Sequence, residues 1–292
     1  MQAESSCINK KMIKSFIPKT FKLRLIKALH FIWLKSIRGA IKEIGLENLF
    51  ANLEQIVPDI REQYSSFKVD TPYLKTKVRG LHAFQISLVN EVITGMENPV
   101  IVDIGDSAGT HLQYLLGLYS DNKKIECLSV NLDDKAVERI RKKGLSAVHT
   151  KAEDLQNYNI KADIFLCFEI LEHLMNPCYF LHELSTKTNA EFLVITVPYL
   201  KNSRIGLHHV RGNRKETVNA ENTHIFELCP TDWKLLVQHS GWKILREKIY
   251  LQYPKHGLFR ITQSLWKRFD FEGFYGLVLK RDDTWSSKYL DW

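Results

Sequence analysis

Short apolar runs alternate with helical segments through the middle of the chain. Five runs rich in Val, Ile, Leu and Phe have the pattern of buried strands, namely the first part of 98–119, then 124–133, 145–150, 162–168 and 191–199. Segments with apolar residues at helical spacing follow within 98–119, at 134–144, where Gly144 is the stop signal, and at 178–188. Strands that alternate with helices predict a parallel sheet covered by helices on both faces.

The C-terminal part departs from this alternation. Residues 241–254 and 273–282 are strand-like runs, and no full crossover helix is required between them. We therefore expect an antiparallel pair of strands at one edge of the sheet.

The N-terminal segment is basic and amphipathic. The formal net charge is +8, and residues 5–42 contain ten Lys or Arg and no Asp or Glu, so the remaining residues carry a net charge of about −2. On a helical projection the basic residues lie on one narrow arc and the apolar residues on the other side. Docking on an anionic membrane surface through residues 10–44 and packing against the protein's own domain both fit this pattern. The longest apolar stretch, 28–34, is far shorter than the ~20 residues that span a bilayer.

These patterns divide the chain into a basic arm at 1–46, a helical cap at 47–95 with breaks at Pro58 and around 70–72, and a main domain at 96–292. The five cysteines are odd in number and form no CxxC pair, which favours reduced thiols over a disulfide framework or a zinc site. We expect a cytoplasmic protein that can lie peripherally on the inner face of the membrane.

The turn after the first predicted strand is made largely of small residues. It reads Asp103-Ile104-Gly105-Asp106-Ser107-Ala108-Gly109-Thr110. Small residues let a ligand approach the backbone, and the start of the following helix supplies N–H groups. In parallel sheets, ligands bind at this carboxyl edge of the strands. The turn lacks the GxGxxG spacing of dinucleotide sites, and such a turn can also serve only to pack strand on helix.

The run Asp103-x-Gly105-x-x-x-Gly109 resembles the first motif of class I S-adenosylmethionine-dependent methyltransferases, acidic-x-Gly-x-Gly-x-Gly, with Ser107 at the middle glycine. The resemblance covers about 98–281. It implies a Rossmann-like α/β fold with a seven-stranded, mostly parallel sheet and an antiparallel C-terminal edge, to which this chain adds an N-terminal helical extension.

The same resemblance implies where the cofactor S-adenosylmethionine binds. In that family an acid at the end of the second strand holds the ribose hydroxyls. Asn131 stands at this position, and its amide can still donate and accept hydrogen bonds, whereas Asp133 is predicted to cap the next helix. The implied cofactor-binding residues are Asp103, Gly105, Ser107, Gly109, Asn131, Ala152, Glu153, Asp154 and Phe168.

The segment FEILEHL, residues 168–174, follows the fourth predicted strand. Glu169 ends that strand at the crevice, and Glu172 and His173 follow at i+3 and i+4, on the same side of a turn. Groups this close repel one another unless protons, donors or a cation lie between them, and a divalent metal is the economical solution. A solvated helix start, with acids favoured by the helix dipole, is the alternative.

This E-x-x-E-H segment resembles that of the O-methyltransferases of ubiquinone biosynthesis and of the small-RNA 3′-end 2′-O-methyltransferases. In both groups the two glutamates, the histidine and a later histidine bind a divalent cation, usually magnesium. The resemblance implies a site of Glu169, Glu172, His173 and His224 for Mg²⁺ or Mn²⁺, although these ligand types also accept iron or zinc. The metal would bind both oxygens of a vicinal diol and activate one for methyl transfer. The candidate catalytic proton acceptors are His208, His209 and His224.

An insert at 200–223 lies between the fifth predicted strand and His224, and we expect it to form a lid over the crevice. Its basic residues suit a polar or anionic acceptor, so we predict O-methylation of a sugar or glycan in surface-polysaccharide or glycolipid assembly. A solvated basic loop has the same pattern. The expected substrate-binding residues are Tyr199, Arg204, Arg211 and Arg214.

Other functions remain open. A terminal RNA ribose also offers a vicinal diol, and its binding would weaken steeply with salt; a quinol or catechol is the acceptor in the ubiquinone enzymes. A cofactor-free, methyltransferase-like partner domain is the non-enzymatic alternative, with Ser107 and Asn131 as signs of decay. The aromatic C-terminal residues Trp266, Trp285 and Trp292 suit a sugar-stacking surface or a homo-oligomer contact.

Overall fold

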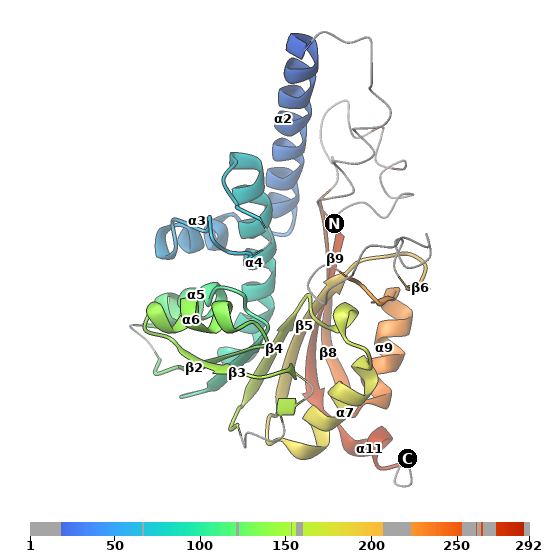
Figure 1. Cartoon of the computed structure of the whole chain (residues 1–292). Helices are drawn as coiled ribbons and strands as arrows, with labels where there is room; N and C mark the ends of the chain where they lie inside the picture. Colours follow the sequence, from blue (N-terminus) through green and yellow to red (C-terminus); the bar gives the residue numbers. More distant parts are fainter. Residues whose placement is uncertain are drawn as a thin grey trace.

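Figure 1 shows the structure, a computed structural model of the chain. It describes residues 19–65, 67–120, 123–152, 154–155, 160–206, 223–252, 261, 264 and 273–288.

A seven-stranded sheet forms the centre of the molecule. Its strand order is β3-β2-β1-β4-β5-β9-β8; β1 to β5 are parallel, and β9 runs antiparallel to both of its neighbours. The predicted Rossmann-like class I methyltransferase fold, with its antiparallel C-terminal edge, is confirmed. The strands are β1 Val100–Ile104, β2 Glu126–Asn131, β3 Ser146–His149, β4 Ile164–Phe168, β5 Phe192–Pro198, β8 Trp242–Leu251 and β9 Gly273–Arg281.

Helices cover both faces of this sheet (Figure 1). The described helices are α2 Lys19–Glu43, α3 Glu47–Ile56, α4 Pro72–Ile93, α5 Thr110–Tyr119, α6 Asp134–Lys142, α7 Pro177–Lys187, α9 Pro230–His239, α11 Asp283–Ser286 and the short 3-10 helix η2 Leu171–His173. A separate two-stranded hairpin pairs β6 Arg204–Ile205 with β7 Phe226–Glu227. The predicted N-cap Asp133 accepts from the Lys135 N–H at 3.0 Å, and Gly144 ends α6 at φ +76°.

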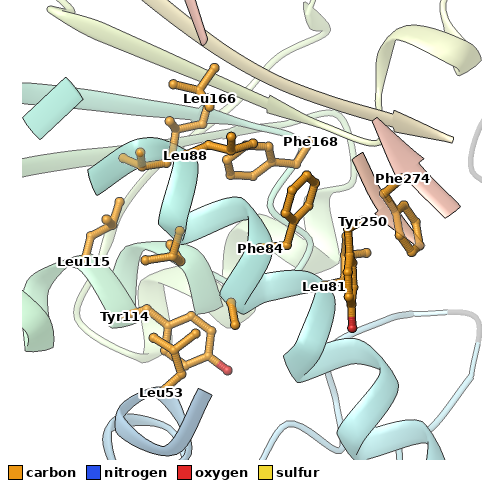
Figure 2. Close-up of a cluster of buried hydrophobic side chains, with 14 of the residues drawn as sticks. Leu53, Leu81, Phe84, Leu88, Tyr114, Leu115, Leu166, Phe168, Tyr250 and Phe274 are labelled. Carbon is orange, nitrogen blue, oxygen red and sulfur yellow. The ribbon is translucent and has the colours of Figure 1, made fainter. Parts of the chain in front are cut away.

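Strand β4 shows why its run is apolar throughout. Ile164, Leu166 and Phe168 belong to one core cluster, and Phe165 and Cys167 to another on the opposite face. Side chains along a strand alternate between faces, so a strand with helices on both sides needs apolar residues at every position. Figure 2 shows the first cluster, in which residues of α3, α4 and α5 surround Leu166 and Phe168 together with residues of β8 and β9.

The last turns of the basic helix α2 pack on the protein's own domain. Ile37, Ala40 and Ile41 are buried in the same core as α4. Gly80 of α4 permits this approach, because a Cβ there would lie 3.1 Å from Cδ1 of Ile41. Packing therefore accounts for the apolar side of 37–41, while membrane docking stays a prediction. Among the described residues, no helix has the length and apolar character needed to cross a membrane.

Candidate active site

The turn between β1 and α5 is closed by its own side chains. Gly105 and Gly109 have φ of +88° and +71°, which glycine adopts without strain. The Asp106 carboxylate accepts hydrogen bonds from the backbone N–H groups of Ala108, Thr110 and His111, at 3.3, 3.3 and 3.1 Å. Thr110 and His111 are the first two residues of α5, and Ala108 lies just before it. The expectation that this helix start offers open N–H groups to a ligand is therefore wrong for these three donors.

Ser107 and Asn131, the two residues that depart from the methyltransferase motif, both form hydrogen bonds with backbone groups. The Ser107 hydroxyl donates to the Gln63 carbonyl at 2.6 Å. The Asn131 amide donates to the Asp106 carbonyl at 3.2 Å and accepts from the Asp133 N–H at 2.9 Å. The two side chains thus hold the turn in place, and the role of Asn131 toward a ribose stays a prediction.

The other predicted cofactor residues lie around this turn. Asp103 is buried at the end of β1, and its Oδ1 has no hydrogen-bond partner within the part of the chain that is described. Ala152 and Asp154 lie in a short turn after β3, Phe168 is buried at the end of β4, and Glu153 falls outside the described residues. Their contact with a cofactor stays a prediction.

Glu169, the first residue after β4, has an uncommon backbone conformation. Its φ is +55°, and across the described ranges it is the one non-glycine residue with a positive φ. This conformation costs a side-chain-bearing residue about 1–2 kcal/mol, and such strain tends to persist at functional sites. The Glu169 N–H donates to the Thr196 carbonyl of β5 at 2.8 Å, which fixes the turn against the next strand.

Three of the four predicted metal ligands come together beyond this turn. Each of Glu172, His173 and His224 offers one ligand atom, and these atoms all lie within 4.8 Å of one another. Glu169 is not in this group of three, although its charge acts on Glu172 and its own Oε1 is buried without a hydrogen-bond partner in the described residues. The site thus joins η2 to His224, two residues before β7.

Both histidines are oriented through their Nδ1 atoms. His173 Nδ1 is 2.9 Å from the Thr223 carbonyl oxygen, and His224 Nδ1 is 2.9 Å from Oε1 of Glu227. These oxygens accept, so each Nδ1 carries a proton, and in the neutral form of each ring Nε2 then carries the lone pair. His173 Nε2 lies 3.9 Å from Oε1 of Glu172. Metal-binding histidines show this arrangement, with the second nitrogen donating to a carbonyl or carboxylate.

Burial raises the pKa of both acids, and repulsion from Glu169 raises that of Glu172 further. Glu172 is 1% exposed, and neither of its carboxylate oxygens has a hydrogen-bond partner among the residues that the structure describes. Burial, and then the charge of Glu169, raises the pKa of Glu172 well above its usual range. Burial also raises the pKa of Glu169 to about 8, against the hydrogen bond from Thr196. A divalent cation would offset both effects, so these residues fit a metal site.

The cofactor turn and the acidic segment are neighbours at the carboxyl edge of the sheet. A Cβ on Gly105 would lie 2.2 Å from Cδ1 of Ile170, so the two segments are in contact. Tyr64, in the segment before α4, lies near both segments. Burial raises the pKa of Tyr64, and the charges of Glu169 and Asp106 raise it further.

A buried polar chain links Asp103 to Glu169. Asp103 Oδ2 is 2.9 Å from His111 Nδ1, and His111 Nε2 is 3.1 Å from Oε1 of Gln85. Gln85 Nε2 donates to the Thr196 hydroxyl at 3.0 Å, and that hydroxyl bonds the Glu169 carboxylate. Burial lowers the pKa of His111, but the charges of Asp106 and Asp103 and the hydrogen bond with Asp103 outweigh it and raise that pKa above its usual value.

Two of the predicted substrate residues lie in the described part of the chain. Tyr199 follows β5 and is half-buried, and Arg204 is on β6, where its Nε donates to the Glu227 carboxylate. The other two, Arg211 and Arg214, and the predicted proton acceptors His208 and His209 lie outside the described residues. The substrate and catalytic roles of all these residues stay predictions.

The fold is that of the class I S-adenosylmethionine-dependent methyltransferases. No protein-family model and no curated protein matches the sequence, but solved structures match the fold. The [4+2]-cyclase SpnF is 12% identical at a TM-score of 0.51, with 80% of this chain and 92% of SpnF covered. A proposed sarcosine dimethylglycine methyltransferase from Galdieria sulphuraria is 13% identical at a TM-score of 0.51, with 71% and 88% covered. At such identities the likeness defines the fold and leaves the reaction to the site.

Several site residues were not found from the sequence. Glu227 had a local signal, because it stands three residues after His224. Gln85, His111 and Tyr64 had none, because only the packing of α4, α5 and the preceding segment brings them to the crevice.

Proposed function

We propose that the protein is an S-adenosylmethionine-dependent O-methyltransferase that requires a divalent cation, Mg²⁺ or Mn²⁺. The observation that carries this proposal is the buried carboxylate of Glu172, which has no hydrogen-bond partner among the described residues, beside two histidines whose Nδ1 protons are held by oxygens. This donor set suits a divalent cation and has no evident structural use without one.

The residues of the site divide the work of methyl transfer. Glu172, His173 and His224 would hold the cation, with Glu169 beside them. The cation, when bound, would lower the pKa of an acceptor hydroxyl and orient a vicinal diol. S-adenosylmethionine, when bound near Asp103 and Gly105, would supply the methyl group.

The hydroxyl proton needs an acceptor, and the oxygen then bonds to the methyl carbon as the carbon–sulfur bond breaks. We assign His224 to the cation, because its Nδ1 proton is committed to Glu227 and its Nε2 is the remaining ligand atom. His208 and His209 therefore remain the candidate bases.

The acceptor that we propose is a sugar or glycan hydroxyl next to a second hydroxyl. Support comes from the charges of the insert, where Arg204, Arg211 and Arg214 suit an anionic or strongly polar acceptor. The basic arm would bring the protein to an anionic membrane surface on which glycolipids are assembled.

A panel of acceptors tests this proposal. Labelled S-adenosylmethionine is offered with sugars and nucleotide sugars that carry a vicinal diol, with matched deoxy sugars that lack one of the two hydroxyls, with a catechol and with short RNA. We expect label in the diol sugars and none in the deoxy sugars. Label in RNA instead, with binding that weakens steeply with salt, would point to the terminal ribose.

One observation favours a non-enzymatic alternative. The side chains of Asp106, Ser107 and Asn131 form hydrogen bonds with backbone groups of the turn and its neighbours. A partner domain that binds no cofactor could keep its turn in this way. Calorimetry with S-adenosylmethionine separates the two functions. Binding in the micromolar range supports the enzyme, and no heat at millimolar cofactor supports the partner domain.

A further inference from the structure

Glu227 is a partly buried acid that touches the candidate metal site without belonging to it. Its side chain is 13% exposed. One carboxylate oxygen, Oε1, lies 2.9 Å from His224 Nδ1, and the other, Oε2, accepts from Nε of Arg204. The two oxygens therefore have different tasks, since one faces the histidine and the other faces a cation that fixes the carboxylate.

The surrounding hairpin makes this geometry rigid. Arg204 and Glu227 are directly opposite each other in the β6–β7 pair. The same segment is bonded to another ligand residue: the Ile225 N–H donates to the Glu172 carbonyl at 2.6 Å, and the Gly206 N–H, next to β6, donates to the Ile225 carbonyl at 2.7 Å. Backbone hydrogen bonds thus tie the segment that carries Glu227 to η2.

We infer that Glu227 is a positioning residue for the metal site: it holds His224 in the Nδ1-protonated form, aims Nε2 at the cation and, held by Arg204, increases the basicity of the ligand. A carboxylate behind a ligating histidine acts in this way in metal sites, and its removal typically costs about 10–100-fold in metal affinity. This inference rests on the proposed function, because it needs His224 to be a ligand.

Titration calorimetry with Mn²⁺ on the full chain tests the inference without any acceptor. We expect Glu227→Gln to weaken Mn²⁺ binding about 10-fold and Glu227→Ala toward 100-fold, because glutamine keeps an acceptor for His224 Nδ1 and alanine does not. Arg204→Gln should cost less than Glu227→Ala, since the acceptor remains. Glu247→Gln is the matched control: Glu247 on β8 also accepts from two side chains, Lys234 and Tyr275, and its loss should leave Mn²⁺ affinity unchanged.

A second measurement uses the unsubstituted protein, so it does not depend on how the variants fold. Nitrogen-15 spectra of the histidine rings, recorded at a pH at which the rings are neutral, should show the His224 proton on Nδ1 in the metal-free protein. A neutral ring with its proton on Nε2 would overturn the inference.

Glu172→Gln separates the failure of this inference from the failure of the proposed function. If Glu172→Gln abolishes Mn²⁺ binding while Glu227→Gln and Glu227→Ala bind as tightly as Glu247→Gln, the role of Glu227 is wrong and the metal site stands. If Glu172→Gln binds Mn²⁺ as the unsubstituted protein does, the metal site itself is wrong, and the role of Glu227 fails with it.

Discussion

At the scale of single residues, the raised pKa values of Glu169 and Glu172 show that the ionised forms of both acids are disfavoured without a cation. Both acids are buried with few hydrogen-bond donors. Burial raises the pKa of each, and the charge of Glu169 raises the pKa of Glu172 further. In the metal-free protein they take up protons on folding. Metal binding releases those protons, so affinity should rise with pH.

The first prediction concerns stability without metal. A carboxyl whose folded pKa is raised stabilises the fold at low pH, below about 4.5, and loses that contribution as pH rises toward the folded pKa, which for Glu169 is about 8. The variant Glu172→Gln does not titrate, so its stability relative to the parent should rise between pH 5 and 8 by at most about 1.4 kcal/mol per pH unit. Urea unfolding in chelator measures the difference, and parallel pH curves for the two proteins would contradict it.

The second prediction concerns the backbone of Glu169. Glycine adopts its φ of +55° without strain, whereas alanine does not. Both variants lose the carboxylate, so Glu169→Ala is the matched control, and Glu169→Gly should be more stable than Glu169→Ala by about 1 kcal/mol in chelator. Equal stability would mean that the turn relaxes and stores no strain.

At the scale of elements, helix α2 is part of the folded domain over its last turns. The third prediction is that Ile41→Ala, at a residue 4% exposed, destabilises the protein by about 2–4 kcal/mol. Phe31→Ala is the control, because Phe31 on the same helix is 57% exposed and should cost less than about 1 kcal/mol. Thermal unfolding of the two variants measures the difference. Equal losses of stability would mean that the packing of Ile41 against the domain does not stabilise the protein.

The secondary-structure elements differ in how well the sequence predicts them. The strands and helices of the sheet were predictable because each is a run of four or more residues with one clear period, as in β4. The β6–β7 hairpin was not, since each strand has two residues and the pairing of Arg204 with Glu227 spans an insert. The closure of the cofactor turn by Asp106 was also missed, because it depends on a side-chain conformation that small-residue spacing does not specify.

The candidate metal site divides in the same way. Glu172, His173 and His224 were predictable from residue type and order, and the structure brings them within 4.8 Å. The Thr223 carbonyl that orients His173 is 50 residues away in the sequence, so only the fold brings it there. Glu227, which orients His224, is three residues away from it. Residue types in a local pattern predict the ligands, whereas the contacts that orient them depend on the folded structure.

At the scale of the whole molecule, charge is concentrated at one end of the chain. The fourth prediction is that the protein binds anionic vesicles and that Lys10→Gln, Lys11→Gln and Lys14→Gln together weaken binding, at about 1 kcal/mol per lysine. The control is the same exchange at Lys68, Lys124 and Lys142, whose side chains are 68%, 78% and 79% exposed. Vesicle co-sedimentation compares the two sets, and equal losses would mean that general basicity, and not the arm, attracts the protein.

The most direct test of the central claim is methyl transfer to the diol sugar that the acceptor panel identifies, measured before chelation, after full chelation and after Mg²⁺ or Mn²⁺ is returned. The account predicts that transfer stops on chelation, returns with either ion and is absent in Glu172→Gln. It should persist in Glu183→Gln, a control at another buried glutamate, which pairs with Lys187. Transfer that survives complete chelation, or that Glu172→Gln retains in full, would contradict the claim.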